Sequence, residues 1–234
     1  MRILLINANT TASMTADMVE AARRVASADC EVFGTTAATG VASIDGYHDE
    51  LLGAAAVASA TREHEGTYDA AIIACFGDPG LDAARELSDA PVVGIAEASF
   101  ITAITLGRRF SVLTTLDRGV PPIEDVVHRH GFRERCASVR ASGLTVLEAD
   151  ADPEGAADAL EEVGRQAIDA DGADVLCLGC GGMVGLRSRL ESRLGVPVVE
   201  SVPAGLVLAE GLVRCELRTS KVRGYKQPEP NAYS

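Results

Sequence analysis

Two cysteines, Cys75 and Cys180, each follow a short apolar run and have a glycine within the next two residues. A cysteine thiol becomes a usable base when its thiolate is stabilised, for example near the N-terminus of a helix. One such group on each side of a carbon atom could take a proton from one face and return it to the other. The pair is therefore typical of proton transfer that inverts a stereocentre. A lone cysteine of this kind is more often a small buried hydrophobic residue, so the hypothesis depends on the pairing.

An internal repeat supports the pairing. Residues 68–99 and 173–204 share an apolar run, a cysteine, a glycine, a leucine six residues after the cysteine, and then Pro-Val-Val. The cysteines are 105 residues apart, and Arg2–Asn7 resembles Arg109–Thr114 at an offset of 107. Two matches at nearly one offset predict two related half-chains. The alternative, a coincidence between generic α/β segments, is disfavoured by the shared cysteine position.

The elements that would position these cysteines alternate along the chain. We expect strands at 2–7, 70–75, 91–95, 110–114, 175–179 and 197–200, with weaker strands at 30–34 and near 144–147. We expect helices at 11–27, 48–65, 80–87, 97–106, 120–130, 153–169, 183–194 and 203–213. Strand–helix alternation predicts parallel sheets covered by helices, and therefore an α/β fold made of two similar halves.

In a parallel sheet, ligands bind beyond the carboxyl ends of the strands. Asn7, Cys75, Thr114 and Cys180 all fall at such ends, so two facing halves would bring both cysteines to one cleft. Small residues after each cysteine would let backbone N–H groups approach an enolate-like oxygen. We expect the loop Ser43–Gly46 to lie over the cleft mouth.

Several of these residues also have a local explanation. Asn7 and the residues that follow it could form a turn and a helix N-cap, bind a polar planar substrate, or do both. Thr114 and Thr115 have the same two explanations. Asp78 precedes a proline, and we expect it to cap the helix that follows, a structural role.

Two other chemistries compete for the second cysteine. Cys177 and Cys180 form a C-x-x-C, but no second such pair exists and no histidine follows at ligand spacing, so we expect no metal site. The run Gly179–Gly185 with Glu200 suggests a nucleotide-binding, Rossmann-like protein, yet its spacing deviates and it lies too close to the C-terminus. That hypothesis stays as a weaker alternative.

Composition excludes other partners. The 234 residues carry a net charge of −13, which repels nucleic acid and anionic membranes, and no segment is apolar enough for a signal peptide or a membrane span. Without a signal peptide, the six cysteines are expected to be reduced thiols. These features predict a cytoplasmic protein that acts on a small molecule.

The chain resembles the aspartate/glutamate/hydantoin racemase superfamily, and within it the hydantoin and allantoin racemases. The motifs that carry the resemblance are ILLINANTTASM, ASIDGYHDE, IIACFGDPGLDAARE, FSVLTTL, VLCLGCGGM, GVPVVE and the late Thr219-Ser220-Lys221. It implies two pseudo-twofold-related α/β domains, 1–98 plus 207–234 and 99–206, with the active site between them. It also implies a homo-oligomer, no cofactor, and Cys75 and Cys180 as the two bases. The implied substrate-binding residues are Asn7, Phe76, Gly77, Thr114, Thr115, Gly181 and Gly182.

The substrate class follows from a contrast within the superfamily. Glutamate and aspartate racemases typically carry a carboxylate at the end of the first strand and a histidine after the second cysteine. This chain has Asn7 and Gly182-Met183 there. A free amino acid has a poorly acidic α-carbon and needs such help, whereas a hydantoin carbanion is delocalised into the ring. The resemblance thus favours a hydantoin-type ring, with an amino-acid racemase or a maleate-type cis-trans isomerase as alternatives.

Overall fold

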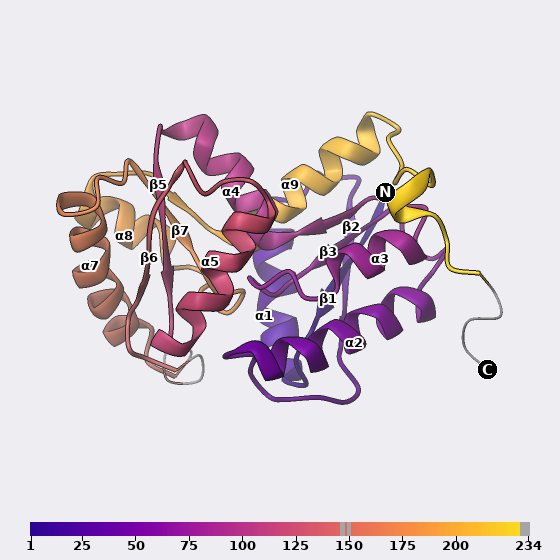
Figure 1. Cartoon of the computed structure of the whole chain (residues 1–234), viewed down its shortest axis with the longest axis horizontal. Helices are drawn as coiled ribbons and strands as arrows, with labels where there is room; N and C mark the ends of the chain where they lie inside the picture. Colours follow the sequence, from indigo (N-terminus) through magenta and orange to yellow (C-terminus); the bar gives the residue numbers. More distant parts are fainter. Residues whose placement is uncertain (146–147, 149–150, 230–234) are drawn as a thin grey trace.

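The computed structural model describes residues 1–145, 148 and 151–229. Each half contains one four-stranded sheet in which all paired strands are parallel (Figure 1). The first sheet has the order β2 (Glu31–Thr36), β1 (Arg2–Asn7), β3 (Ala70–Ile73) and β4 (Val92–Gly94). The second has the order β6 (Cys136–Ala141), β5 (Phe110–Thr114), β7 (Val175–Leu178) and β8 (Val198–Val199). The identical strand order confirms the predicted α/β fold of two related halves.

Eight α-helices connect and cover these strands in the described part of the chain. They are α1 (Ala12–Arg23), α2 (Tyr47–Glu63), α3 (Leu81–Leu87), α4 (Ile95–Leu106), α5 (Val120–Arg129), α7 (Pro153–Asp169), α8 (Arg187–Leu194) and α9 (Ser201–Arg214). Two short 3₁₀ helices lie at Asp117–Gly119 and Arg223–Tyr225. In this part of the molecule, no helix has both the length and the apolar character needed to cross a bilayer.

The central strand β1 shows why the sheets form. Its residues Ile3 to Ile6 are at most 1% exposed, so both faces of the strand are buried. A continuous apolar run, rather than an alternating one, is what a parallel strand covered by helices requires. β5 has the same character and holds the same central place in the second sheet.

Two helices cross between the halves and join them. α4 follows β4 but packs on β5, β7 and β8, whereas α9 follows β8 but packs on β1, β3 and β4 (Figure 1). Phe100 of α4 stacks on Phe110 of β5, with ring centroids 5.1 Å apart. The predicted domain boundaries at 98/99 and 206/207 therefore fall inside these two crossing helices, and one hydrophobic core extends through both halves.

The C-terminal segment returns to the first half. The Nζ of Lys221 donates to the carbonyl oxygens of Arg85, Glu86 and Ser88, at 2.7, 3.1 and 2.7 Å. These acceptors lie at the end of α3, where carbonyl groups lack partners within the helix.

Three sequence predictions differ from the structure by more than two residues. The helix expected at 11–27 ends at Arg23. The edge strand of the second sheet lies at Cys136–Ala141, earlier than the strand expected near 144–147, of which residues 146 and 147 lie outside the described part. The helix expected from residue 183 begins only at Arg187. Gly185 has a φ of +81°, which a residue inside a right-handed α-helix cannot have, so the helix starts after it.

Candidate active site

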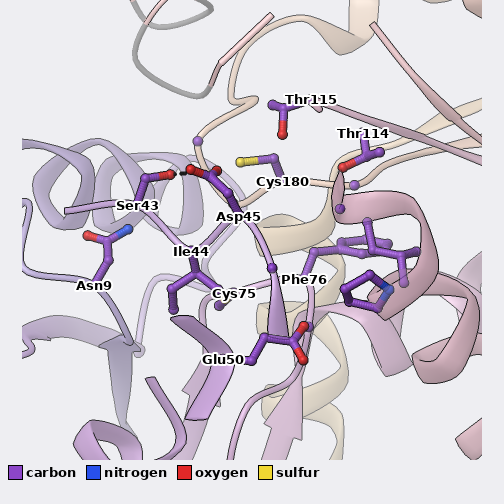
Figure 2. A pocket seen from close by; sticks show the side chains of 18 of the residues that line it. Asn9, Ser43, Ile44, Asp45, Glu50, Cys75, Phe76, Thr114, Thr115 and Cys180 are labelled. Carbon is purple, nitrogen blue, oxygen red and sulfur yellow. Dashed lines mark hydrogen bonds between the residues drawn. The ribbon is translucent and has the colours of Figure 1, made fainter. Parts of the chain in front are cut away.

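A cavity lies where the carboxyl ends of the two sheets face each other, and side chains from both halves line it (Figure 2). Eight of the nine residues proposed from the sequence line this cavity: Cys75, Phe76, Gly77, Thr114, Thr115, Cys180, Gly181 and Gly182. The loop Ser43–Gly46 also lines it, as expected for a segment near the cleft mouth.

The two cysteines hold equivalent positions in the fold. Cys75 lies two residues after β3, and Cys180 lies two residues after β7. The residue before each cysteine donates its N–H to the central strand of its sheet, Ala74 to Ile6 at 2.9 Å and Gly179 to Leu113 at 2.7 Å. Neither cysteine lies within a strand, and both are only partly buried.

The same turn follows each cysteine. The N–H of Asp78 donates to the carbonyl of Cys75 at 2.9 Å, and the N–H of Met183 donates to the carbonyl of Cys180 at 3.2 Å. The turns approach each other closely, because a Cβ atom on Gly181 would lie 2.7 Å from the carbonyl oxygen of Ala74. Glycine at 181 therefore lets the second turn pack against the first.

Burial dominates the electrostatics of both thiols. It raises the pKa of Cys75 to about 12, and negative charge on Cys180, on Glu50 and on Asp78 acts in the same direction. Burial also raises the pKa of Cys180, with Asp45 adding to the effect. Backbone N–H groups act against burial and lower each pKa, from Gly77 for Cys75 and from Gly182 and Met183 for Cys180. These N–H groups face the sulfur atoms, where they favour a thiolate.

Asn7 does not line the cavity. Its side chain is buried, donates to Asn9 Oδ1 and Thr15 Oγ1 at 2.9 Å each, and accepts from the backbone N–H of Asn9 at 3.1 Å. Asn9 does line the cavity. Asn7 thus supports the turn that carries Asn9, and in this structure Asn9 rather than Asn7 lines the cavity.

Sequence reasoning also missed two carboxylates at the cavity, Asp45 and Glu50. The side chain of Asp45 accepts from Ser43 Oγ at 3.0 Å, and its N–H donates to Asp49 Oδ2 at 3.1 Å. The turn composition at Ser43–Gly46 predicted the loop but gave no sign that Asp45 faces the cavity.

The residues of the alternative metal and nucleotide-binding sites have structural roles instead. Cys177 is buried inside β7, with its sulfur 3.8 Å from the carbonyl oxygen of Ser99 on α4. Glu200 accepts from the N–H of Gly185 at 2.6 Å, so its carboxylate supports the loop after Cys180. Among residues 1–145, 148 and 151–229, no group of three or more His, Cys, Asp or Glu side chains could hold a metal ion.

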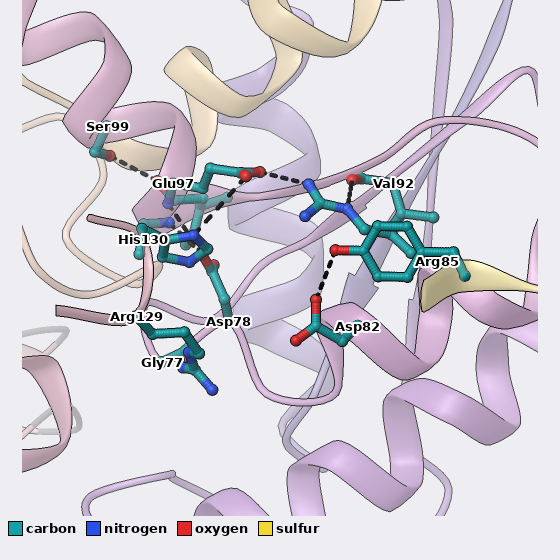
Figure 3. Close-up of polar contacts among 12 residues, drawn as sticks. Gly77, Asp78, Asp82, Arg85, Val92, Glu97, Ser99, Arg129 and His130 are labelled. Carbon is teal, nitrogen blue, oxygen red and sulfur yellow. Dashed lines mark hydrogen bonds and ion pairs between the residues drawn. The ribbon is translucent and has the colours of Figure 1, made fainter. Parts of the chain in front are cut away.

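Asp78 was predicted to cap the helix that follows it, and it caps a different helix. α3 begins at Leu81 with Gly80 as N-cap, and no side chain caps it. The Asp78 carboxylate instead accepts from the N–H groups of Ala96 and Glu97, both at 3.0 Å, in the first turn of α4 (Figure 3). It is a cap for a helix 17 residues further along, which local sequence patterns do not indicate.

Comparisons with known proteins agree with this architecture. The family model described as Asp/Glu/Hydantoin racemase matches residues 3–209. A hydantoin racemase from Pseudomonas sp. (strain NS671) is 42% identical over 100% of this chain and 94% of its own length. One from Rhizobium meliloti is 43% identical over 99% of this chain and 97% of its own. The crystal structure of an allantoin racemase from Pseudomonas fluorescens is 47% identical and superposes with a TM-score of 0.96, with 98% of both chains covered.

The match to the family model spans most of the chain, and the relatives are similar over nearly their full length. Both findings confirm the resemblance noted in the sequence. The protein therefore belongs to the Asp/Glu/Hydantoin racemase family and is an isomerase of the racemase type.

Proposed function

We propose that the protein is a cofactor-independent racemase that inverts the C5 stereocentre of a hydantoin-type ring, with Cys75 and Cys180 as its two bases. One observation carries the proposal: the cysteines hold equivalent positions after β3 and β7, and both line one cavity between the halves. Two thiols delivered from facing halves can reach opposite faces of one bound carbon atom.

The reaction needs one thiolate and one thiol at its start. The thiolate of Cys75 takes the proton from C5, and the electron pair moves into the adjacent ring carbonyl as an enolate. The thiol of Cys180 then gives its proton to the opposite face of C5. The enzyme is left with a thiol at Cys75 and a thiolate at Cys180, which is the starting state for the other enantiomer.

The coupling between the two thiols fits a site that holds at most one thiolate at a time. Charge on Cys180 raises the pKa of Cys75, so the two sulfurs are close enough to disfavour ionisation of both at once. The N–H of Gly77 on one side, and those of Gly182 and Met183 on the other, stabilise whichever thiolate forms. The pair therefore exchanges a proton without any group that a cofactor would have to supply.

The ring substrate is favoured by the residues at the end of β1 and directly after Cys180. The family's amino-acid racemases typically place a carboxylate where this chain has Asn7 and a histidine after the second cysteine, where this chain has Gly182 and Met183. Relatives more than 40% identical are named hydantoin racemases, and one with a solved structure is named an allantoin racemase. A homo-oligomeric assembly is part of the same proposal.

The test begins with single enantiomers of allantoin, a 5-alkylhydantoin, aspartate and glutamate, followed by polarimetry after dialysis against a chelator and without added cofactor. We expect rotation to decay for a hydantoin-type compound only. Inversion of aspartate or glutamate instead, or a rate restored only by added metal, would contradict the proposal.

Cysteine variants then test the two-base step. Cys75→Ser and Cys180→Ser should each abolish inversion in both directions, because each direction uses both groups, and a lost general acid or base costs about 10²–10⁴-fold or more. Each variant should still exchange the C5 hydrogen of one enantiomer with D₂O without inverting it. The two variants should prefer opposite enantiomers. If one variant keeps near-normal inversion, or both prefer the same enantiomer, the opposed-face arrangement is wrong.

A further inference from the structure

The loop that carries Cys75 is held by residues from the other half of the molecule. We propose that His130 and Arg129, at the end of α5, are positioning residues that fix this loop through Asp78 and Gly77. This inference deepens the proposed function, because it assigns a role in the Cys75 half of the two-base reaction. We call the four residues Gly77, Asp78, Arg129 and His130 the clamp.

Asp78 is the centre of the clamp. Its φ of +45° is in the left-handed region, which non-glycine residues adopt only when their surroundings enforce it. Its carboxylate is 1% exposed and accepts from two N–H groups at the start of α4. The packing is tight, because a Cβ atom on Gly94 would lie 2.2 Å from Asp78 Cγ. The carboxylate contacts and the tight packing against Gly94 therefore both hold the loop at Asp78.

His130 contacts the Asp78 carboxylate from the second half of the molecule (Figure 3). Its Nε2 lies 3.2 Å from Asp78 Oδ2, and its Nδ1 lies 3.8 Å from Glu97 Oε1. Glu97 in turn pairs with Arg85 at 2.6 Å. Burial raises the pKa of the Asp78 carboxyl, and the contact with His130 is the strongest influence that lowers it. The imidazole therefore adds to the two N–H groups of α4 in offsetting the burial of the Asp78 carboxylate.

Arg129 holds the same loop at a second point. Its Nη2 donates to the carbonyl oxygen of Gly77 at 3.1 Å. Gly77 also supplies the N–H that favours the Cys75 thiolate. Arg129, the last residue of α5, and its neighbour His130 therefore hold the two loop residues that follow Phe76, and with them the N–H group that faces the Cys75 sulfur.

Three of the clamp residues, Asp78, Arg129 and His130, act on the loop of Cys75 and do not line the substrate cavity. Neither Asp78 nor His130 lines the cavity that holds Cys75 and Cys180. They line a separate cavity on the other side of the loop, together with Arg85 and Tyr225. The position equivalent to Asp78 after Cys180 is Met183, a buried apolar residue. Loss of the clamp should therefore lower proton transfer by Cys75 and kcat, with little change in KM.

The experiment compares the two cysteines in isolation. His130→Phe keeps an aromatic ring against Phe100, 6.3 Å away in the native protein, but removes the contact with Asp78. We introduce it into Cys180→Ser, where only Cys75 exchanges the C5 hydrogen with D₂O, and into Cys75→Ser, where only Cys180 does. We expect Cys75-dependent exchange to fall about tenfold or more, because small misplacements of a reacting group are costly, and Cys180-dependent exchange to change less than about twofold.

Two further variants make the comparison specific. His130→Gln keeps an N–H donor near Asp78 and should recover part of the Cys75-dependent exchange. His128→Phe, on the exposed face of the same helix, should leave both exchange rates unchanged. If His130→Phe does not fold, Arg129→Met replaces it, since Arg129 is exposed and its loss should show the same selectivity for Cys75 with a smaller effect.

The outcomes separate the two proposals. If the parent Cys75→Ser and Cys180→Ser variants do not prefer opposite enantiomers, the two-base function itself fails. If they do, but the clamp variants slow both exchange reactions equally or slow neither, the clamp is overturned while the two-base function stands.

Discussion

The loops after Cys75 and Cys180 have the same backbone turn but are anchored by different interactions. Polar contacts from α5 of the second half reach the first loop at Gly77 and Asp78. The second loop places Met183 in an apolar cluster of its own half, and its polar contact from Glu200 to Gly185 is also within that half. The loop after Cys75 thus depends on polar contacts from the other half, whereas the side chain and polar contacts of the loop after Cys180 lie within its own half.

The comparison shows what the internal repeat does and does not fix. The strand order and the hydrogen bonds around each cysteine are the same in the two halves, and they deliver both sulfurs to one cavity. The side chains that stabilise each delivery are not repeated. We therefore expect substitutions at the contacts between the halves to slow proton transfer by Cys75. Substitutions in the loop after Cys180 should mainly lower the free energy of unfolding.

The largest expected change in the free energy of unfolding comes from substitutions of Met183. Met183→Ala leaves a space in the apolar cluster, and truncation of a buried methionine to alanine costs about 2–5 kcal/mol of unfolding free energy. Met183→Leu nearly conserves volume and should cost less than about 1.5 kcal/mol. Urea unfolding measures both. A loss below about 1 kcal/mol for Met183→Ala would show that apolar packing does not anchor the second loop.

A smaller loss of unfolding free energy is expected for a substitution at Gly94. Gly94→Ala forces a methyl group against the Asp78 carboxylate, and overpacking typically costs about 1–3 kcal/mol. It should also reduce Cys75-dependent exchange. The control is Gly211→Ala, where the new Cβ meets nothing within 4 Å, and where alanine should stabilise α9 slightly. Equal unfolding free energies for the two variants would mean that Asp78 moves freely, which contradicts the clamp.

The sequence predicted the sheets well because their signal is local. The apolar runs of β1 and β5 are found where expected, at Arg2–Asn7 and Phe110–Thr114. β6 was misplaced because Cys136–Ala141 lies at a sheet edge and is only partly buried along its length, so its apolar signal is weak. Both cysteines were found through the repeat, which pairs distant positions without a structure.

The contacts between halves could not be predicted in this way. Asp78 looked like a local helix cap, yet its carboxylate binds the start of α4, and His130, which lies 3.2 Å from it, is 52 residues away in the sequence. The Asp78 contacts depend on which surfaces meet after folding, and propensity and spacing do not encode that. Asn7 is a local case: it ends a central strand, but the turn folds back so that Asn9 and Thr15 satisfy its amide.

The smallest expected effect compares the two thiols through the pH dependence of stability. Burial raises the pKa of Cys75 to about 12 in the folded protein, above the ordinary thiol value, and raises that of Cys180 as well. Between pH 9 and 12 the unfolded chain therefore loses the Cys75 proton while the folded protein keeps it, so unfolding is favoured as pH rises. The stability contributed by the protonated thiol is present below pH 9 and should fall by on the order of 1 kcal/mol at pH 10.

Urea unfolding of the wild type, Cys75→Ser and Cys180→Ser at pH 8 and pH 10 measures this loss, and ionisations common to all three proteins cancel. We expect the loss to be smallest in Cys75→Ser, because serine does not ionise in this range. An equal loss in all three proteins would mean that both thiols are exposed enough to ionise normally, and the buried two-thiol site would have to be revised.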